Sequence, residues 1–138
     1  MDTRVNSTLD DNHTGRGGLT TMLDWNAYRQ QLLAGTGEIG RMSPDIVRGY
    51  RQLSEAGAKT GKLDAKTREL IALAVSVTRQ CDGCITMHTD AAVKHGATRE
   101  EVLEALGVAI AINAGAALVY SARAMDAFTA RSAEARAE

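Results

Sequence analysis

The stretch that decides the architecture of this chain is Cys81-Asp82-Gly83-Cys84-Ile85-Thr86-Met87-His88, or CDGCITMH. It contains the only two cysteines of the sequence, in a C-x-x-C spacing, and a histidine four residues after the second one. Two cysteines this close can form a disulfide and open it again, and so can exchange two electrons. On a helix, His88 would lie one turn from Cys84 and could exchange a proton with its sulfur. These residue types and spacings predict a thiol-redox enzyme.

The same stretch marks a break between two predicted helices. Asp64 is a typical N-cap for the first helix, whose apolar residues cover nearly all sides and indicate burial. The second helix is predicted to start near Asp82 and to stop at Gly96. A turn at residues 79–82 makes the two helices antiparallel, as an αα-hairpin with the C-x-x-C at the start of its second helix.

The hairpin brings a carboxylate to the dithiol. Glu69 lies about ten residues before the turn and His88 about seven after it, so the two side chains can meet at similar depth. We expect Glu69 to hold a proton and His88 to pass it to and from Cys84, the attacking thiolate. Cys81 lies at a helix N-terminus, which stabilises a thiolate, and closes the disulfide. Such a site attacks a peroxide O–O bond, forms a sulfenic acid and needs an external dithiol to be reduced again.

The rest of the chain also has helical periodicity. Apolar residues at helical spacing follow N-cap signals in three further segments: Asp24 begins residues 24–33, Ser43 begins 43–56, and the capping box Thr98-Arg99-Glu100-Glu101 begins a helix that reaches the Asn113-Ala114-Gly115 segment. A final helix is expected at 116–128. The glycines between 35 and 40 are expected to end the first of these helices, and Asn113-Ala114-Gly115 to bend or divide the last stretch. We predict an all-α domain of about six helices over residues 22–130. A disordered tail at 1–21 and a fraying tail at 131–138 flank it.

Composition restricts the classes of function. The chain has 138 residues, 44% of them hydrophobic, which suits one domain with its own core. Its net charge of −1 is not that of a nucleic-acid-binding protein. The low aromatic content of 4% and the 13 glycines fit close-packed helices better than a β-sandwich.

The sequence predicts a cytoplasmic protein without a membrane span. The N-terminus is polar and has no secretory signal, and the apolar run at 105–120 is shorter than the roughly 20 residues that a bilayer requires. In a reducing compartment a cysteine pair is more often catalytic or metal-binding than structural.

The pattern Glu69-x11-Cys81-x2-Cys84-x3-His88 resembles the signature of the alkylhydroperoxidase D-like (AhpD-like) group of the carboxymuconolactone decarboxylase superfamily. The resemblance covers roughly residues 43–128. It implies an all-helical, cofactor-free thiol peroxidase, a peroxiredoxin-type antioxidant oxidoreductase that reduces alkyl hydroperoxides. In it Cys84 is the peroxidatic cysteine, Cys81 the resolving one, and Glu69 and His88 form a proton relay.

The resemblance also implies partners. The reductant would be a lipoyl-bearing or thioredoxin-like protein, and the assembly a trimer or hexamer. A homo-oligomer is expected from the residues as well, because Val102–Val119 is apolar on more than one face and too large for a small monomer to cover. The chain departs from the family pattern at Gly83, where family peroxidases can carry a second histidine.

Other interpretations remain open from the residues alone. Cys81, Cys84, His88 and His95 could hold zinc, but no second C-x-x-C completes a ligand set, so we favour redox chemistry and expect no metal. The dithiol could instead serve a redox sensor or a disulfide reductase. A carboxymuconolactone decarboxylase-like activity would not use the thiols at all.

Overall fold

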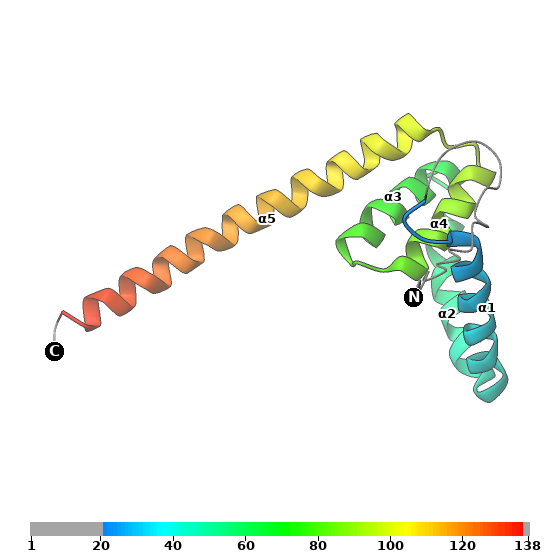
Figure 1. The fold of residues 1–138 in the computed structure, drawn as a ribbon, viewed down its shortest axis with the longest axis horizontal. Helices are drawn as coiled ribbons and strands as arrows, with labels where there is room; N and C mark the ends of the chain where they lie inside the picture. The colour runs from blue at the N-terminus through cyan, green and yellow to red at the C-terminus, as the bar shows by residue number, and fades with distance from the viewer. Residues whose placement is uncertain (1–20, 137–138) are drawn as a thin grey trace, which may run out of the picture.

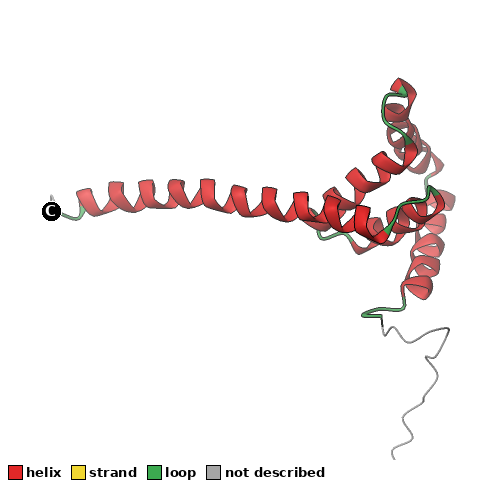
Figure 2. Cartoon of the chain, turned by 90° about the horizontal axis from the view of Figure 1, so that it is seen from above, coloured by secondary structure: helices red, strands yellow, loops and turns green. Residues whose placement is uncertain are grey.

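The protein is all-α, as predicted. The structure, a computed structural model, describes residues 21–136, and every regular element in that range is helical (Figures 1 and 2). The elements are α1 (Trp25–Met42), α2 (Pro44–Ala56), the 3-10 helix η1 (Gly57–Thr60), α3 (Ala65–Thr78), α4 (Asp82–Lys94) and α5 (Arg99–Glu134). The predicted tail at 1–21 lies outside the described residues except for its last residue. The predicted domain limits of 22 and 130 stay a prediction, and α5 continues beyond the second.

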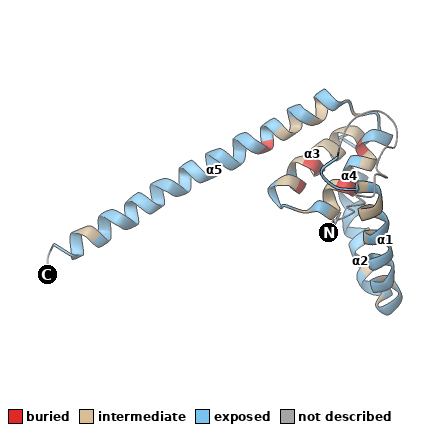
Figure 3. Cartoon of the chain, in the orientation of Figure 1, coloured by how far each residue is buried: buried red, intermediate tan, exposed pale blue. Residues whose placement is uncertain are grey.

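Helix α3 is the centre of the packing. It contacts α4 and the first part of α5, while α1 contacts α2 and α4 (Figure 1). The buried residues in the part of the chain that the structure describes lie on α3, α4 and α5, and they are Leu73, Ser76, Thr86, Ala92 and Ala109 (Figure 3). No large side chain among the described residues is fully buried. A single copy of the chain therefore has only a small core of its own.

The predicted N-caps of α3 and α5 are confirmed. The Asp64 carboxylate accepts the Thr67 N–H at 2.7 Å at the start of α3. Thr98 and Glu101 form the predicted capping box of α5, in which Glu101 accepts the Thr98 N–H at 2.8 Å. Lys66 on α3 donates to Glu101 at 2.6 Å, and this hydrogen bond holds the pKa of Glu101 below its usual range. The starts of α3 and α5 are thus tied together.

Helix α1 is longer than predicted. The glycines at 35–40 were expected to end it at Leu33, but it continues to Met42. A Cβ at Gly40 would lie 3.4 Å from Val47 Cγ2, so this glycine faces α2 at close range. Packing against α2 offsets the cost of glycine in a helix, about 1 kcal/mol per residue. Gly40 thus permits close approach of the two helices, while Gly35 and Gly37 lie inside the continuous α1 with open space where a Cβ would stand.

Helix α5 is continuous, and the predicted bend or division at Asn113-Ala114-Gly115 is wrong. The Asn113 side chain donates from Nδ2 to the Ala109 carbonyl at 2.7 Å, so it bonds within its own helix. Alanines before and after this segment favour helix strongly enough to carry the chain through Gly115.

Among residues 21–136, no other helix packs against the second half of α5. Every residue from Ile110 to Arg131 is exposed, and this part projects away from the other helices as an arm (Figures 1 and 3). Among the described residues, α5 is the one helix long and apolar enough to span a membrane, judged by length and composition alone. Core helices of soluble proteins meet the same criterion.

The end of α4 is a Schellman motif around the predicted stop. Gly96 has a φ of 75°, in the left-handed region that glycine adopts without steric cost. Its N–H donates to the Val93 carbonyl at 3.0 Å, and the Ala97 N–H donates to the Ala92 carbonyl at 2.9 Å. Both bonds satisfy carbonyls at the end of the helix.

The end of α3 has the same hydrogen-bond pattern without a glycine. Gln80 has a φ of 52°, and its N–H donates to the Val77 carbonyl at 3.1 Å. The Cys81 N–H donates to the Ser76 carbonyl at 3.1 Å. A side chain in this conformation costs about 1–2 kcal/mol, so the turn that leads into the C-x-x-C is strained.

The two turns predict opposite responses to substitution. Gln80→Gly should raise the free energy of unfolding by about 0.5–1 kcal/mol, because it removes the steric cost. Gly96→Ala should lower it by about 1–2 kcal/mol, because it introduces that cost. Urea unfolding followed by circular dichroism at a fixed protein concentration measures both. Gly49→Ala is the control. It lies at an exposed position inside α2, with open space where the new Cβ would stand, and should be slightly stabilising. A gain in stability for Gly96→Ala would contradict this account.

Candidate functional site

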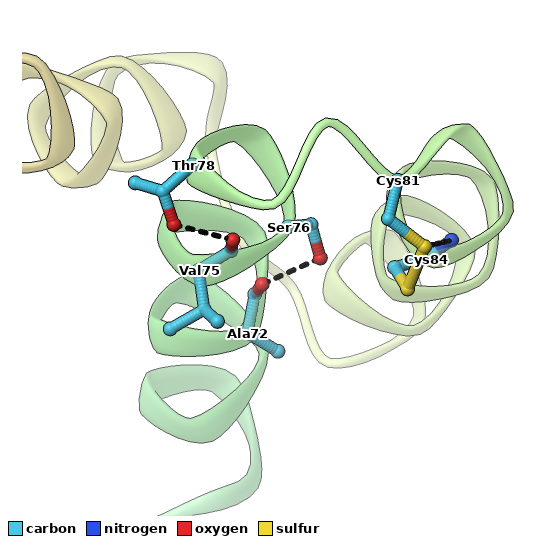
Figure 4. The surroundings of a disulfide bond; sticks show 6 residues. All are labelled: Ala72, Val75, Ser76, Thr78, Cys81 and Cys84. Atoms are coloured by element: carbon cyan, nitrogen blue, oxygen red, sulfur yellow. Dashed lines mark hydrogen bonds between the residues drawn. A yellow bond between two sulfur atoms is a disulfide. The ribbon is translucent and has the colours of Figure 1, made fainter.

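The two cysteines lie at the first turn of α4, where the sequence predicts them. Cys81 is the N-cap residue, and its sulfur accepts the Cys84 N–H at 3.1 Å (Figure 4). The structure joins the two sulfurs in a disulfide, with Cα atoms 5.2 Å apart. Both residues are half-buried. Helix α4 thus starts with a disulfide-bonded cysteine pair whose first sulfur accepts a backbone N–H.

Polar groups at the end of α3 bond within that helix. The Ser76 hydroxyl donates to the Ala72 carbonyl at 2.6 Å, and the Thr78 hydroxyl donates to the Val75 carbonyl at 2.7 Å (Figure 4). The Ser76 carbonyl accepts the Cys81 N–H, as described above. Both hydroxyls of this turn therefore bond to backbone carbonyls of α3 and not to a cysteine sulfur.

Glu69 and His88 meet across the hairpin, as predicted. His88 Nδ1 lies 2.7 Å from Glu69 Oε2, and the two side chains are 37% and 21% exposed. An ionised carboxylate can only accept, so the imidazole donates through Nδ1–H. Nε2 is then the basic nitrogen of the neutral ring. The pair therefore fixes the tautomer and the orientation of the imidazole.

Cys84 and His88 share one face of α4 because they are four residues apart on a continuous helix. The four residues singled out from the sequence thus form two bonded pairs from α3 and α4. One pair is the disulfide of Cys81 and Cys84, and the other is the hydrogen bond of Glu69 and His88. Their catalytic roles remain a prediction at this point.

The described residues contain no side-chain cluster that would support a zinc site. Within residues 21–136, no group of three or more His, Cys, Asp and Glu side chains lies close enough to hold a metal ion. His95 is the C-cap residue of α4, and its N–H donates to the Ala91 carbonyl at 3.0 Å.

Two residues beside the cysteines are not indicated as part of the site by the sequence. Gln80 holds the strained turn before Cys81. Leu32 on α1 packs over Gly83, the residue between the two cysteines in the C-x-x-C. Leu32 belongs to the apolar periodicity of residues 24–33, but no signal in the sequence pairs it with Gly83.

Comparison with known proteins identifies the family of the chain. A model of the carboxymuconolactone decarboxylase family matches residues 44–127, which include α2, α3, α4 and most of α5. An uncharacterized protein of Haemophilus influenzae is 47% identical over 110 residues, which cover 80% of this chain and 97% of that protein.

Solved structures are similar as well. One is the crystal structure of an apo carboxymuconolactone decarboxylase family protein from Legionella pneumophila, with a TM-score of 0.62 and 39% identity over 75% of this chain and 93% of that one. Another is a protein from Methanobacterium thermoautotrophicum, with a TM-score of 0.57 and 31% identity over 62% of this chain and 94% of that one. The helical hairpin, the C-x-x-C with its glutamate and histidine, and these matches lead to one conclusion: the chain belongs to the carboxymuconolactone decarboxylase family, in its alkylhydroperoxidase D-like group.

Proposed function

We propose that the protein is a thiol-dependent alkyl hydroperoxide reductase that uses Cys84 and Cys81 as its redox pair and Glu69 and His88 as a proton relay. The observation that carries the proposal is the Nδ1–Oε2 hydrogen bond of 2.7 Å between His88 and Glu69, one helical turn from Cys84. Neither a structural disulfide nor a pair of buried thiols requires a base oriented in this way.

In the oxidative half-reaction, the reduced protein attacks the hydroperoxide. His88 takes the proton of the Cys84 thiol, helped by the carboxylate of Glu69. The Cys84 thiolate attacks the terminal oxygen, the O–O bond breaks, and His88 returns the proton to the leaving alkoxide. The products are an alcohol and a sulfenic acid on Cys84. The Cys81 thiolate then attacks that sulfur, and water leaves as the disulfide forms.

In the reductive half-reaction, an external dithiol opens the disulfide. The thiolate of a lipoyl-bearing or thioredoxin-like protein attacks Cys84, and Cys81 leaves. The Cys84 N–H that contacts the Cys81 sulfur stabilises the departing thiolate. The second thiol of the reductant then releases Cys84. The net reaction converts one hydroperoxide and one dithiol into alcohol, water and a disulfide.

Serine substitutions test the two cysteine roles. Cys84→Ser should reduce hydroperoxide turnover with dithiothreitol to the uncatalysed rate. Cys81→Ser should consume one equivalent of hydroperoxide and stop at the sulfenic acid of Cys84, detected by mass spectrometry after dimedone trapping. Serine is a good N-cap, so the start of α4 is preserved in Cys81→Ser. Sustained turnover by Cys84→Ser would exclude the proposal.

Turnover with dithiol and the serine variants together separate the other candidates. A redox sensor would form the Cys81–Cys84 disulfide but need not cycle with dithiol. A decarboxylase-like activity, which the description of the family suggests, would persist in both serine variants. It would also persist after alkylation of both thiols.

Glu69→Gln tests the relay. Glutamine keeps the size of the side chain and can accept a hydrogen bond, but it lacks the negative charge that supports a protonated imidazole. We expect the rate of disulfide formation with hydroperoxide, measured by stopped flow, to fall by about 10²-fold. Glu104→Gln, at an exposed position on α5, is the matched control and should react like the wild-type protein. An unchanged rate in Glu69→Gln would remove Glu69 from the relay.

We propose further that the α5 arm is covered by other copies of the chain, in a cytoplasmic trimer or hexamer. The arm is apolar on more than one face, and Ile110, Leu118 and Phe128 are 68%, 74% and 68% exposed. Apolar faces of a helix require burial. Lipid is the weaker alternative, because Arg123 and Asp126 on the arm would be costly in a bilayer.

A charge on the arm should disrupt the assembly. Leu118→Glu is expected to shift the protein from a trimer or hexamer to smaller species in sedimentation velocity at micromolar concentration. Met22→Glu, at a residue 97% exposed and ahead of α1, is the control and should leave the sedimentation unchanged. A wild-type protein that sediments as a monomer would contradict the assembly.

A further inference from the structure

The C-x-x-C is in close contact with a residue from outside the hairpin. Gly83 has no side chain, and Leu32 of α1 fills the space where one would stand. A Cβ placed on Gly83 would lie 3.1 Å from Leu32 Cδ2 and 3.5 Å from Cδ1. Ordinary contacts between carbon atoms are about 3.5–4.0 Å, so any side chain at this position would push Leu32 away. The bare backbone of the first turn of α4 is therefore a packing surface for α1.

Polar contacts hold α1 against α4. The Thr86 hydroxyl donates to the Trp25 carbonyl at 3.5 Å, and Arg29 pairs with Asp90 at 3.0 Å. Lys94 donates to the same carboxylate at 2.8 Å, and its hydrogen bond, with the nearby Arg29, holds the pKa of Asp90 below its usual range. The family match begins at residue 44, so α1 lies outside the matched segment.

The helical geometry of α4 shows where Cys84 lies relative to the face that contacts α1. Successive residues of a helix are about 100° apart around its axis. The positions that contact α1, namely 83, 86 and 90, fall within a sector of about 60°. Cys84 lies about 100° from Gly83, and His88 about 140° from it on the side that meets α3. Cys84 therefore lies between the face that α1 covers and the face that α3 covers.

Leu32 is well placed to limit access to that sulfur. It is half-buried against α4, whereas Leu33, the next residue, is 43% exposed. We propose that Leu32 determines the specificity of the thiol site by forming the wall beside Cys84, so that slim, unbranched hydroperoxides reach its sulfur and branched ones are excluded. The choice of substrate class rests on the proposed peroxidase function, while the wall itself does not.

Alkylation of the reduced protein tests the wall without any peroxidase activity. The second-order rates are measured for the small reagent N-ethylmaleimide and the bulky reagent fluorescein-5-maleimide, with the modified cysteine identified by mass spectrometry. Leu32→Ala should raise the ratio of bulky to small rates at Cys84 on the order of tenfold, the size of effect that removal of a few methyl groups has in a pocket. Leu33→Ala, the matched control, should leave the ratio unchanged. An unchanged ratio in Leu32→Ala, or an equal rise in Leu33→Ala, would overturn the proposal.

A second comparison tests the selection of substrates. Leu32→Ala should raise the kcat/KM for tert-butyl hydroperoxide relative to that for hydrogen peroxide, again on the order of tenfold. If the wild-type protein reduces neither peroxide, the proposed function fails, and the alkylation ratio still decides the role of Leu32. If Leu32→Ala loses its helical circular dichroism, Leu32→Val takes its place. A smaller rise in the alkylation ratio is then expected, and an unchanged ratio overturns the wall.

Discussion

Cys81 ends one helix and begins the next, and the site depends on this double use. Its N–H closes the last turn of α3 on the Ser76 carbonyl, while its sulfur receives the Cys84 N–H at the start of α4. Helix α4 therefore follows directly on the Schellman motif that ends α3, with no extra loop residues between them. This short connection fixes which residues of α3 lie opposite which residues of α4, and Glu69 meets His88 across the hairpin. The strain at Gln80 accompanies this tight connection.

Much of the fold could be predicted from local signals. The N-caps Asp64 and Thr98 and the stop at Gly96 act through hydrogen bonds within a few residues, so the sequence alone indicates them. The glycines of α1 and the Asn113-Ala114-Gly115 segment of α5 were misleading for one reason. Local rules count the cost of glycine and asparagine in a helix, but not the contact of Gly40 with α2 or the bond of Asn113 to its own helix.

The contacts of the site likewise fall into those that residue spacing predicts and those that it does not. The meeting of Glu69 with His88 follows from counting residues on both sides of one turn, and the 2.7 Å hydrogen bond confirms it. The packing of Leu32 on Gly83 joins residues 51 positions apart in different helices. Residue spacing carries no information on such a contact. Gly83 departs from the family pattern of a second histidine, and the structure supplies a physical reason: α1 occupies the space that a side chain would need.

Helix α3 connects the site to α5, whose second half forms the exposed arm. It supplies Glu69 to the site, and it also receives the first turns of α5, where Lys66 bonds to Glu101. The described residues bury no large side chain fully, so the packing of α3 within one copy is weak. If other copies cover the α5 arm, they bury apolar surface on the same helix that is anchored to α3. Assembly would then also stiffen the support of Glu69, and the relay would be most precisely held in the oligomer.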